Sequence, residues 1–456
     1  MKTITINKVS YIGWIVILSL FISSCSKFVE IEERSGTRPL KYTSDYQYLL
    51  NNTTTFERSY GFPLISCDDA GVENPTQQNT LSTQWALTYS WSETRYSDNE
   101  EDIDWSNYYN QINICNQITD GVMNSEGGSM TDKKYILAQA RTHRAYAYLN
   151  LANMYAKPYD PTTASKDLGL PLLTTSYLFS SLERVSLDKV YQQIIADLEL
   201  SIKDLPNLPD FNCEPSKAAA YAILAETYLQ MRNFTKAGLY ADSVLMIQNT
   251  LTDLNNYVSN PSTLPKKLND QEIIFSKTVT GTYYPSLTLS SDLLQLIGEK
   301  DLRYKLFTAK DYRGYGRYYS RYQYTYEGVY VGPNVPEMML IKAESKAREG
   351  DYSSAVDILN TLRKKRFQPA DYTDLTASSA SDALALVINE RRRELFGRGF
   401  RWFDMRRLNY DQAFAKSYSR TFKGQTYTLE TNSNRFTYAI AEKYILLNPE
   451  MKQNPR

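Results

Sequence analysis

The sequence is poor in the residues on which most enzymes depend. Histidine occurs once, at His143, and the four cysteines (Cys25, Cys67, Cys115 and Cys213) include no CxxC pair. A single histidine removes the commonest general base and metal ligand from most catalytic sites, and the cysteine spacing predicts neither a zinc site nor a disulfide framework. His143 lies at helical spacing from neighbouring arginines, so we expect a structural role for it.

Charge of one sign and glycine-rich motifs are also missing. Lys+Arg and Asp+Glu both number 51 among 456 residues, whereas a duplex-binding protein is usually clearly basic. There is no G-x-S-x-G motif, and Gly397-Arg398-Gly399 lacks the third glycine of a phosphate-binding loop. We therefore expect no nucleic-acid partner, no cofactor and no metal.

The N-terminus lacks a hydrophobic run long enough to span a bilayer. Lys2 and Lys8 precede the apolar run Ile12–Ile22, which is shorter than the roughly 20 residues of a spanning helix and predicts a signal peptide. The ending Ile-Ser-Ser-Cys25 is typical of a lipobox, whose thiol receives the lipid. We expect a signal peptide over residues 1–24 and an acylated Cys25; the alternative is an ordinary secretory signal with a chance cysteine.

What the chain does contain is helical periodicity with an internal repeat. The pattern Y-x-x-L-A-x-x-Y occurs at Tyr148–Tyr155 and Tyr221–Tyr228, and it matches the first helix of a tetratricopeptide repeat. A third unit is predicted at Met339–Arg366, and further helices at Trp105–Ile118 and between Ser186 and Pro206. The fold class is therefore mostly α, a tetratricopeptide-repeat-like scaffold.

Two long segments, about Asn52–Glu101 and about Asn249–Pro336, lack this periodicity. We expect them to be non-helical loops with small β elements, and loops of this length in a compact domain are usually functional.

An arginine-rich stretch, Ile388–Leu408, stands near the C-terminus. It carries seven arginines against three acids (Glu390, Glu394 and Asp404), with bulky aromatic residues between them. Arginine stems can cover apolar surface while their guanidinium groups pair with carboxylates. We interpret the stretch as a structural clamp that joins the C-terminus to the repeats.

Taken together, these motifs resemble the SusD/RagB family of surface nutrient-binding lipoproteins. The matching stretches are Cys25 followed by KFVEIEE, Trp105-x₃-Tyr109-x₂-Ile112, Arg144–Tyr148 through Leu170-Pro171, and Ser216–Ala220. The C-terminal signature comprises Glu390, Arg391, Arg393, Glu394, Arg401, Trp402, Phe403, Asp404 and Arg407.

The resemblance implies a helical, non-enzymatic protein anchored by lipid to the outer membrane and facing the cell exterior. It would bind a glycan, or alternatively a peptide, and deliver it to a SusC-like, TonB-dependent transporter. The regions 25–230 and 270–456 would form one compact unit. Two readings of another class stay open, a surface glycosidase and a repeat-only assembly scaffold.

A glycosidase would need two carboxylates that flank the scissile bond. Asp68-Asp69 and the acidic run Asp98–Asp104 are candidates. The run lacks EF-hand spacing, so we expect a solvated loop there rather than a calcium site.

We predict the ligand site in the two long segments, because aromatic rings suit the apolar face of a sugar. Trp85 and Trp91 lie in the first segment, and Tyr283, Tyr284, Tyr318 and Tyr322 in the second. The last two belong to a cluster of eight tyrosines: Tyr312, Tyr315, Tyr318, Tyr319, Tyr322, Tyr324, Tyr326 and Tyr330. Alternation such as Tyr322, Tyr324 and Tyr326 also describes one face of an ordinary half-buried strand.

Overall fold

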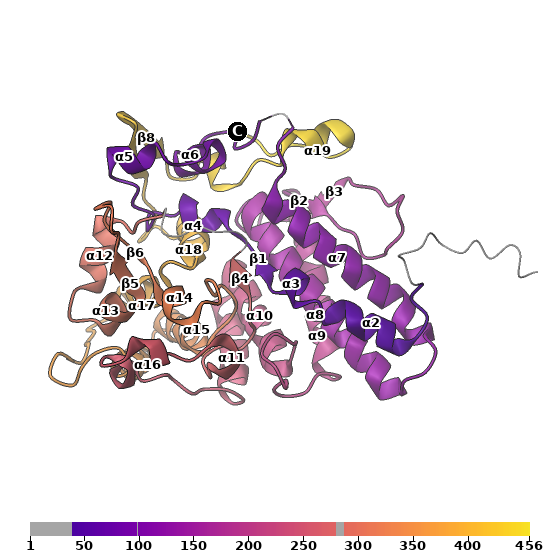
Figure 1. The fold of residues 1–456 in the computed structure, drawn as a ribbon, viewed down its shortest axis with the longest axis horizontal. Coiled ribbons are helices and arrows are strands. Elements are labelled where there is room, and N and C mark those ends of the chain that lie inside the picture. Colours follow the sequence, from indigo (N-terminus) through magenta and orange to yellow (C-terminus); the bar gives the residue numbers. More distant parts are fainter. Residues whose placement is uncertain (1–38, 98, 280–286) are drawn as a thin grey trace, which may run out of the picture. The chain divides into compact units, whose positions relative to one another are not determined.

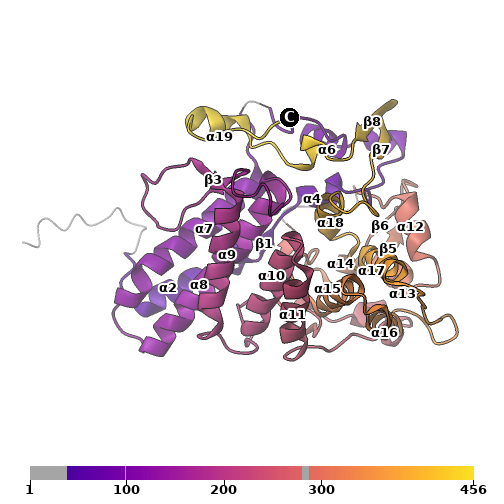
Figure 2. The ribbon, with the colours of Figure 1, turned by 180° about the vertical axis from the view of Figure 1, so that it is seen from behind.

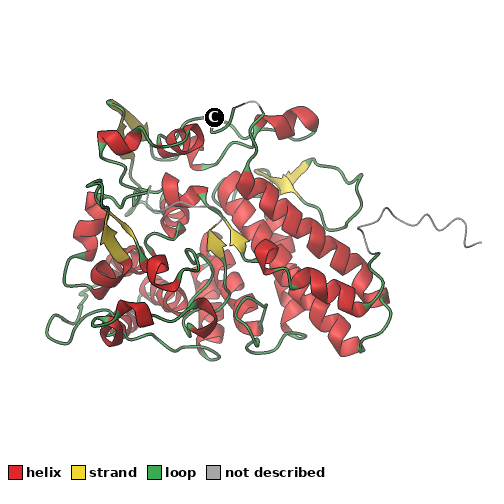
Figure 3. Ribbon diagram, in the orientation of Figure 1, coloured by secondary structure: helices red, strands yellow, loops and turns green. Residues whose placement is uncertain are grey.

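The computed structural model describes residues 39–97, 99–279 and 287–456. The predicted signal peptide, Cys25, Tyr283 and Tyr284 lie outside the described residues. Residues 42–456 form one compact unit, and residues 1–41 form a second, of which only 39–41 are described. Helices dominate the larger unit (Figure 3), which confirms the predicted fold class.

The scaffold is a series of helices in which each packs against the next along the chain (Figure 1). In order they are α7 (Ile103–Gly121), α8 (Met130–Tyr155), α9 (Leu187–Ile202), α10 (Lys217–Gln230), α11 (Phe234–Leu245), α15 (Val335–Arg348), α16 (Tyr352–Arg363) and α17 (Ala380–Leu395). The two predicted repeat units at Tyr221 and at Met339 are therefore present as α10–α11 and α15–α16. They lie side by side although a long segment separates them in sequence.

Local sequence explains where these helices begin. Ser129 and Asp132 form a capping box at the start of α8, in which Ser129 Oγ accepts from the backbone N–H of Asp132 at 3.1 Å. Ser216 caps α10, and Asp351 caps α16. Such caps satisfy backbone N–H groups that have no partner within the helix.

Several tyrosines are buried in the helical core. Tyr146, Tyr148 and Tyr155 of α8 are almost fully buried. Their hydroxyls have partners: Tyr155 donates to Asp102 at 2.6 Å, and Tyr148 donates to the Leu173 carbonyl at 2.8 Å. A buried hydroxyl needs such a bond, so many tyrosines of this chain serve packing rather than ligand binding.

The expectation that the two long segments are non-helical is wrong. The first contains α3 (Thr53–Phe56), α4 (Phe62–Ser66), α5 (Pro75–Gln78) and α6 (Thr83–Tyr89). The second contains α12 (Ser291–Ile297), α13 (Leu302–Phe307), α14 (Arg321–Thr325) and the 3₁₀ turns η3 (Leu254–Tyr257), η4 (Pro261–Thr263) and η5 (Lys267–Asn269). These helices are too short to show a 3.6-residue period, and side-chain caps such as Asn74 and Ser290 begin them.

The strands form two-stranded pairs within the described residues. They are β1 (Arg58–Ser59) with β4 (Thr278–Val279), β2 (Leu168–Pro171) with β3 (Arg184–Ser186), β5 (Thr308–Lys310) with β6 (Arg317–Tyr319), and β7 (Tyr418–Phe422) with β8 (Gln425–Leu429). The remaining helical elements are α2 (Thr43–Leu50), α18 (Phe400–Leu408), α19 (Glu442–Leu447), η2 (Val122–Asn124) and η6 (Asn434–Phe436). Figures 1 and 2 show α5, α6, β7 and β8 gathered on the side away from α11 and α16.

Candidate ligand site

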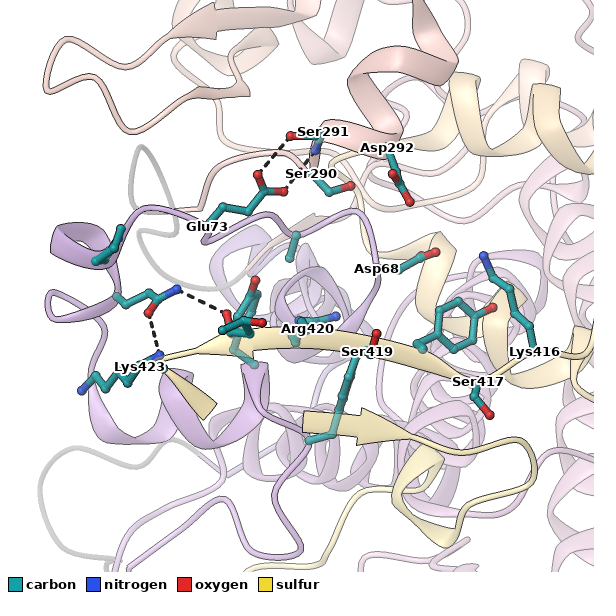
Figure 4. A pocket seen from close by; sticks show the side chains of 18 of the residues that line it. Asp68, Glu73, Ser290, Ser291, Asp292, Lys416, Ser417, Ser419, Arg420 and Lys423 are labelled. Atoms are coloured by element: carbon teal, nitrogen blue, oxygen red, sulfur yellow. Dashed lines mark hydrogen bonds between the residues drawn. The ribbon is translucent and has the colours of Figure 1, made fainter. Parts of the chain in front are cut away.

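A cavity of about 860 Å³ opens where three distant segments meet (Figure 4). Its walls are residues 68–79, the start of α12 at Ser290–Asp292, and residues 416–424, which include β7. The volume suits a drug-sized ligand or a short sugar chain. The cavity is therefore the candidate ligand site.

The first two walls are joined by close backbone contacts. The Gly71 N–H donates to the Thr288 carbonyl at 2.8 Å, and the Ser290 N–H donates to the Asp69 carbonyl at 2.8 Å. A Cβ on Gly71 would lie 2.5 Å from Ser290 Cα, so only glycine allows this approach. Glu73 then accepts from the hydroxyl of Ser291 at 3.0 Å.

The third wall is attached through one buried amide. Gln78 of α5 accepts from the backbone N–H of Lys423 at 2.6 Å and donates to the carbonyls of Val72 at 3.0 Å and Thr421 at 3.4 Å. These bonds tie α5 to the turn of the β7–β8 hairpin, where Figure 4 labels Lys423. The hairpin has a sequence signal, Lys423-Gly424 between two alternating runs, that the sequence analysis overlooked.

An arginine and two aromatic rings form the floor. The Arg420 guanidinium carbon lies 3.9 Å from the ring centroid of Trp91 and 4.2 Å from that of Tyr89. The same group donates to the carbonyls of Ser66 and Cys67 at 3.2 and 3.0 Å. No carboxylate among the described residues pairs with Arg420, so neutral carbonyls and rings stabilise its charge.

The rim mixes both signs of charge. Lys416, Lys423 and Asp292 are exposed at the cavity edge. Asp68 also lines the cavity, but Arg401 binds it in a bidentate pair at 2.7 and 2.9 Å. Burial alone would raise the pKa of Asp68, yet the guanidinium groups of Arg401 and Arg392 hold that pKa well below its usual range.

The glycosidase candidates are thus already engaged in structural contacts. Asp69 accepts from Arg392 at 2.7 Å. In the acidic run, Asp102 caps α7, and Asp104 accepts from the backbone N–H groups of Gly61 and Phe62 at 2.9 and 3.1 Å. Burial, followed by the charge of Asp102, raises the pKa of Asp104 to about 7.

The prediction of a solvated loop at the acidic run is accordingly wrong for Asp102 and Asp104, which are both buried. Asp98 lies outside the described residues. In the described part of the chain, no group of three or more His, Cys, Asp or Glu side chains is arranged to hold a metal ion. Cys67, Cys115 and Cys213 are free thiols.

Of the predicted ligand residues whose side chains the structure describes, Trp91 alone lines the cavity. Trp91 lines the cavity but is only 4% exposed, and its indole N–H donates to the Ser66 carbonyl at 2.8 Å. Trp85 is half-buried in α6 and packs against the core. Tyr318 is buried in β6. The side chain of Tyr322 and all of Tyr283 and Tyr284 lie outside the described residues.

The strand interpretation of the tyrosine alternation is also wrong. Residues 321–325 form α14, and β6 ends at Tyr319. The Ser320 N–H donates to the Phe307 carbonyl at 2.8 Å, after which the chain turns into the helix. Exposure instead concentrates at Tyr312 and Tyr326, which are 89% and 87% exposed.

The arginine-rich stretch lies inside the molecule. Glu390 of α17 is fully buried and accepts from Arg303 at 2.7 Å and Arg363 at 3.0 Å. Burial opposes ionisation, but these arginines and Arg393 lower the pKa of Glu390 to about 2. Asp404 of α18 accepts from Arg391 at 2.9 Å.

The remaining signature residues continue this network. Arg407 bonds both Asp404 at 2.8 Å and Glu344 at 2.6 Å, while Glu394 accepts from Arg303 and Arg366. Trp402 is fully buried and Phe403 is 5% exposed. Arg303, Arg363 and Arg366 could not be assigned to this network from the sequence, because no local pattern links them to α17.

Comparison with known proteins gives two family matches. The family described as "Starch-binding associating with outer membrane" matches residues 35–229, and the "SusD family" matches residues 335–456. Two SusD-like proteins of Formosa agariphila are 27% identical over 123 residues and 28% identical over 144 residues, which is 26% and 31% of this chain. These matches span only 22% and 26% of the relatives' own length.

Solved structures share the fold over nearly the whole chain. A SusD superfamily protein from Bacteroides thetaiotaomicron has a TM-score of 0.74 at 18% identity, covering 91% of this chain and 100% of that one. A putative sugar binding protein from Bacteroides vulgatus has a TM-score of 0.72 at 21% identity, covering 92% and 99%. A laminarin binding SusD-like protein has a TM-score of 0.67 at 17% identity, covering 91% and 99%.

Proposed function

Because the chain belongs to the SusD/RagB family, we propose that it binds a nutrient glycan in the cavity between residues 68–79, 290–292 and 416–424. The observation that carries this proposal is the cavity itself, which combines a polar rim with a floor of stacked arginine and aromatic groups. Sugar hydroxyls need hydrogen-bonding partners at such a rim. The printed names of two similar structures, one sugar binding and one laminarin binding, support a carbohydrate ligand.

The proposed role is binding without catalysis. Asp68 is the carboxylate that both lines the cavity and belongs to a predicted catalytic pair, and Arg401 neutralises it. A general acid must carry a proton near working pH, and a carboxylate whose pKa is held low by two arginines does not. Asp68 is therefore unsuited to act as a general acid, and its predicted partner Asp69 is buried on Arg392 at 2.7 Å and does not line the cavity.

The proposal extends to membrane attachment and a partner. Cys25 would carry the lipid, and a TonB-dependent transporter in the same outer membrane would receive the ligand. Among the described residues, no helix has the length and apolar character needed to cross a bilayer. The broad surface of the helical repeats suits a protein partner, so a pull-down from native membranes in mild detergent should recover the transporter; recovery of the protein alone would favour the scaffold reading.

Calorimetric titration tests the ligand site. We expect laminarin or soluble starch fragments to bind the parent protein, and the rim variant Lys416→Ala/Asp292→Ala to bind about thirtyfold more weakly, because two polar contacts of about 1 kcal/mol each are lost. Both side chains are exposed, so the variant should fold normally. Trp91 and Tyr318 are less suitable targets, because their burial makes truncation costly to stability.

The matched control is Glu299→Ala/Lys300→Ala, which removes one exposed charge of each sign outside the cavity. Equal affinities in the two double variants would place the site elsewhere. Binding of tryptic peptides in preference to every glycan would support the peptide alternative, and shortened sugar products in the titration cell would contradict a binding-only role.

A further inference from the structure

The loop between β2 and β3 ends in an exposed apolar tip. Tyr177, Leu178 and Phe179 are 64%, 88% and 82% exposed, and the rings of Tyr177 and Phe179 lie 5.7 Å apart. Three consecutive large apolar side chains in water are unfavourable, and such a patch usually marks a contact surface. The tip lies apart from the ligand cavity, whose lining includes none of these residues.

Hydrogen bonds at the base of the loop fix the tip in place. Asp120 of α7 accepts from Ser176 N–H at 2.7 Å, from Ser176 Oγ at 2.8 Å and from Thr175 Oγ1 at 3.0 Å. Beyond the tip, the hydroxyl and N–H of Ser180 donate to the Tyr177 carbonyl at 2.8 and 3.2 Å. The apolar side chains are therefore presented by an ordered turn.

The composition of the loop suits the boundary of a lipid layer. Residues 168–182 contain no charged side chain, and Thr174, Thr175, Ser176, Ser180 and Ser181 flank the apolar tip. Charged side chains are unfavourable near acyl chains, whereas hydroxyl groups and tyrosine rings are well accommodated among lipid headgroups. Within the loop, charge first appears at Glu183, beside β3. A protein-binding loop would have no need to exclude charge around its tip.

The tip also lies at the end of the unit where the lipid tether joins. Tyr42, the first residue of the larger unit, pairs with Glu126, and Thr43 N–H donates to the Glu126 carbonyl at 2.9 Å. Glu126 follows closely after Asp120, which holds the loop. Both ribbon views place the start of α2 and the β2–β3 loop at the same end (Figures 1 and 2).

The length of chain between Cys25 and Tyr42 limits how far the larger unit can lie from the bilayer. The 17 residues from Cys25 to Tyr42 can span at most about 60 Å when fully extended. Lipid at Cys25 therefore confines this end of the unit to the neighbourhood of the bilayer.

We propose that the Tyr177–Leu178–Phe179 tip inserts into the lipid surface of the membrane beside the anchor, as a second membrane contact. This inference rests on the lipid anchor of the proposed function. A second contact would fix the orientation of the unit on the membrane, since a single point of attachment leaves it free to rotate.

Fluorescence quenching in vesicles tests the insertion. The lipidated full-length chain, carrying Phe179→Trp, is reconstituted into vesicles of phosphatidylethanolamine and phosphatidylglycerol with brominated acyl chains. We expect the added tryptophan to be quenched at least about twofold more than one introduced by Met246→Trp, because only the former would reach the acyl boundary. Met246 is the matched control, since it is 81% exposed and follows directly after α11, away from the β2–β3 loop in sequence.

Equal quenching at the two positions would overturn the inference while leaving the anchor intact. Shielding of the tryptophan of the Phe179→Trp variant only when co-purified transporter is added would also overturn it, in favour of a protein contact. If the chain does not hold to vesicles through Cys25, the proposed anchor is wrong. In that case the Phe179→Trp and Met246→Trp variants are added to preformed brominated vesicles. The difference in their tryptophan quenching then measures insertion of the tip without the anchor.

Discussion

At the scale of single residues, buried charge is the unusual feature of this protein. Arg303 is fully buried and bonds three carboxylates, Asp301, Glu390 and Glu394, at 2.6 to 2.7 Å. Such a network is stable only while every member is paired, because a single buried charge left alone costs several kcal/mol. The arginines of the C-terminal signature are therefore structural components of the core.

Lys277 is a buried cation with which no carboxylate within the described residues forms an ion pair. Its ammonium group donates to the Phe56 carbonyl, lies 3.2 Å from His143 Nδ1 and sits 4.0 Å from the Phe275 ring centroid. Burial lowers the pKa of Lys277 from 10.5 to about 7. His143 is buried beside it, in keeping with the structural role that we predicted.

This shift predicts a pH dependence of stability that Lys277→Met should remove. Between about pH 7 and 10.5 the unfolded chain holds the lysine proton and the folded chain has lost it. The parent's free energy of unfolding should therefore rise with pH by about 1 kcal/mol per unit relative to the variant, and stay level below that window. Urea unfolding at about pH 7.5 and about pH 9.5 measures the difference.

Lys300→Met serves as the control, since the side chain of Lys300 is 78% exposed and should leave the slope as in the parent. A parent and a Lys277→Met variant with the same pH slope would contradict the assignment.

At the scale of elements, the packing of α18 on α4 requires a glycine at the start of α18. Helix α18 begins after Gly399, whose φ is +81°, and packs on α4. A Cβ at Gly399 would lie 2.7 Å from the ring of Tyr60 and 3.0 Å from Leu64 Cδ1. Both a left-handed backbone and the absence of a side chain are needed there.

We predict that Gly399→Ala destabilises the protein by about 3 kcal/mol, of which about 1–2 kcal/mol is backbone strain and the rest steric overlap. Gly424→Ala is a matched control: its φ is +76°, but a Cβ would meet no atom within 4 Å. For Gly424→Ala, chemical denaturation should show a loss of stability of only about 1–2 kcal/mol, which is the backbone strain alone. If the two variants lose the same free energy of unfolding, the steric overlap at Gly399 has no cost, which would contradict the prediction.

At the scale of the whole molecule, function depends on where the compact unit is held. The family matches, the cavity and the apolar tip are compatible with a receptor at a cell surface, and the proposed anchor at Cys25 connects them. The candidate cavity and the helical repeats are built by separate parts of the chain, so the proposed ligand and the proposed transporter would not compete for one surface.

We predict that Cys25→Ala abolishes lipidation. The parent's N-terminal peptide should carry the mass of the acyl chains, and the variant's should not, because only the thiol can form the thioether. Membrane fractionation should show the variant released, since several acyl chains give a stable hold and their loss removes it. Cys213→Ala is the control, and an unchanged membrane fraction for Cys25→Ala would contradict the anchor.

Much of the scaffold could be predicted from the sequence, because helices and repeats depend on residues close together in the chain. The repeats at Tyr148 and Tyr221, the unit at Met339–Arg366 and the signature around Trp402 each give a local pattern. Short capped helices such as α3 and α5 were missed, since one turn of helix has no period to detect.

The candidate site, in contrast, was decided by tertiary structure. Sequence reasoning selected Trp91 for its aromatic ring, and the fold places that ring beneath Arg420, more than three hundred residues away. The buried partners of Glu390 and Glu394 were equally hidden, because Arg303 and Arg366 lie in other segments. A sequence fixes which groups are available and which local turns they favour; which groups meet depends on long-range packing, where burial and pairing energies act between residues that have no relation along the chain.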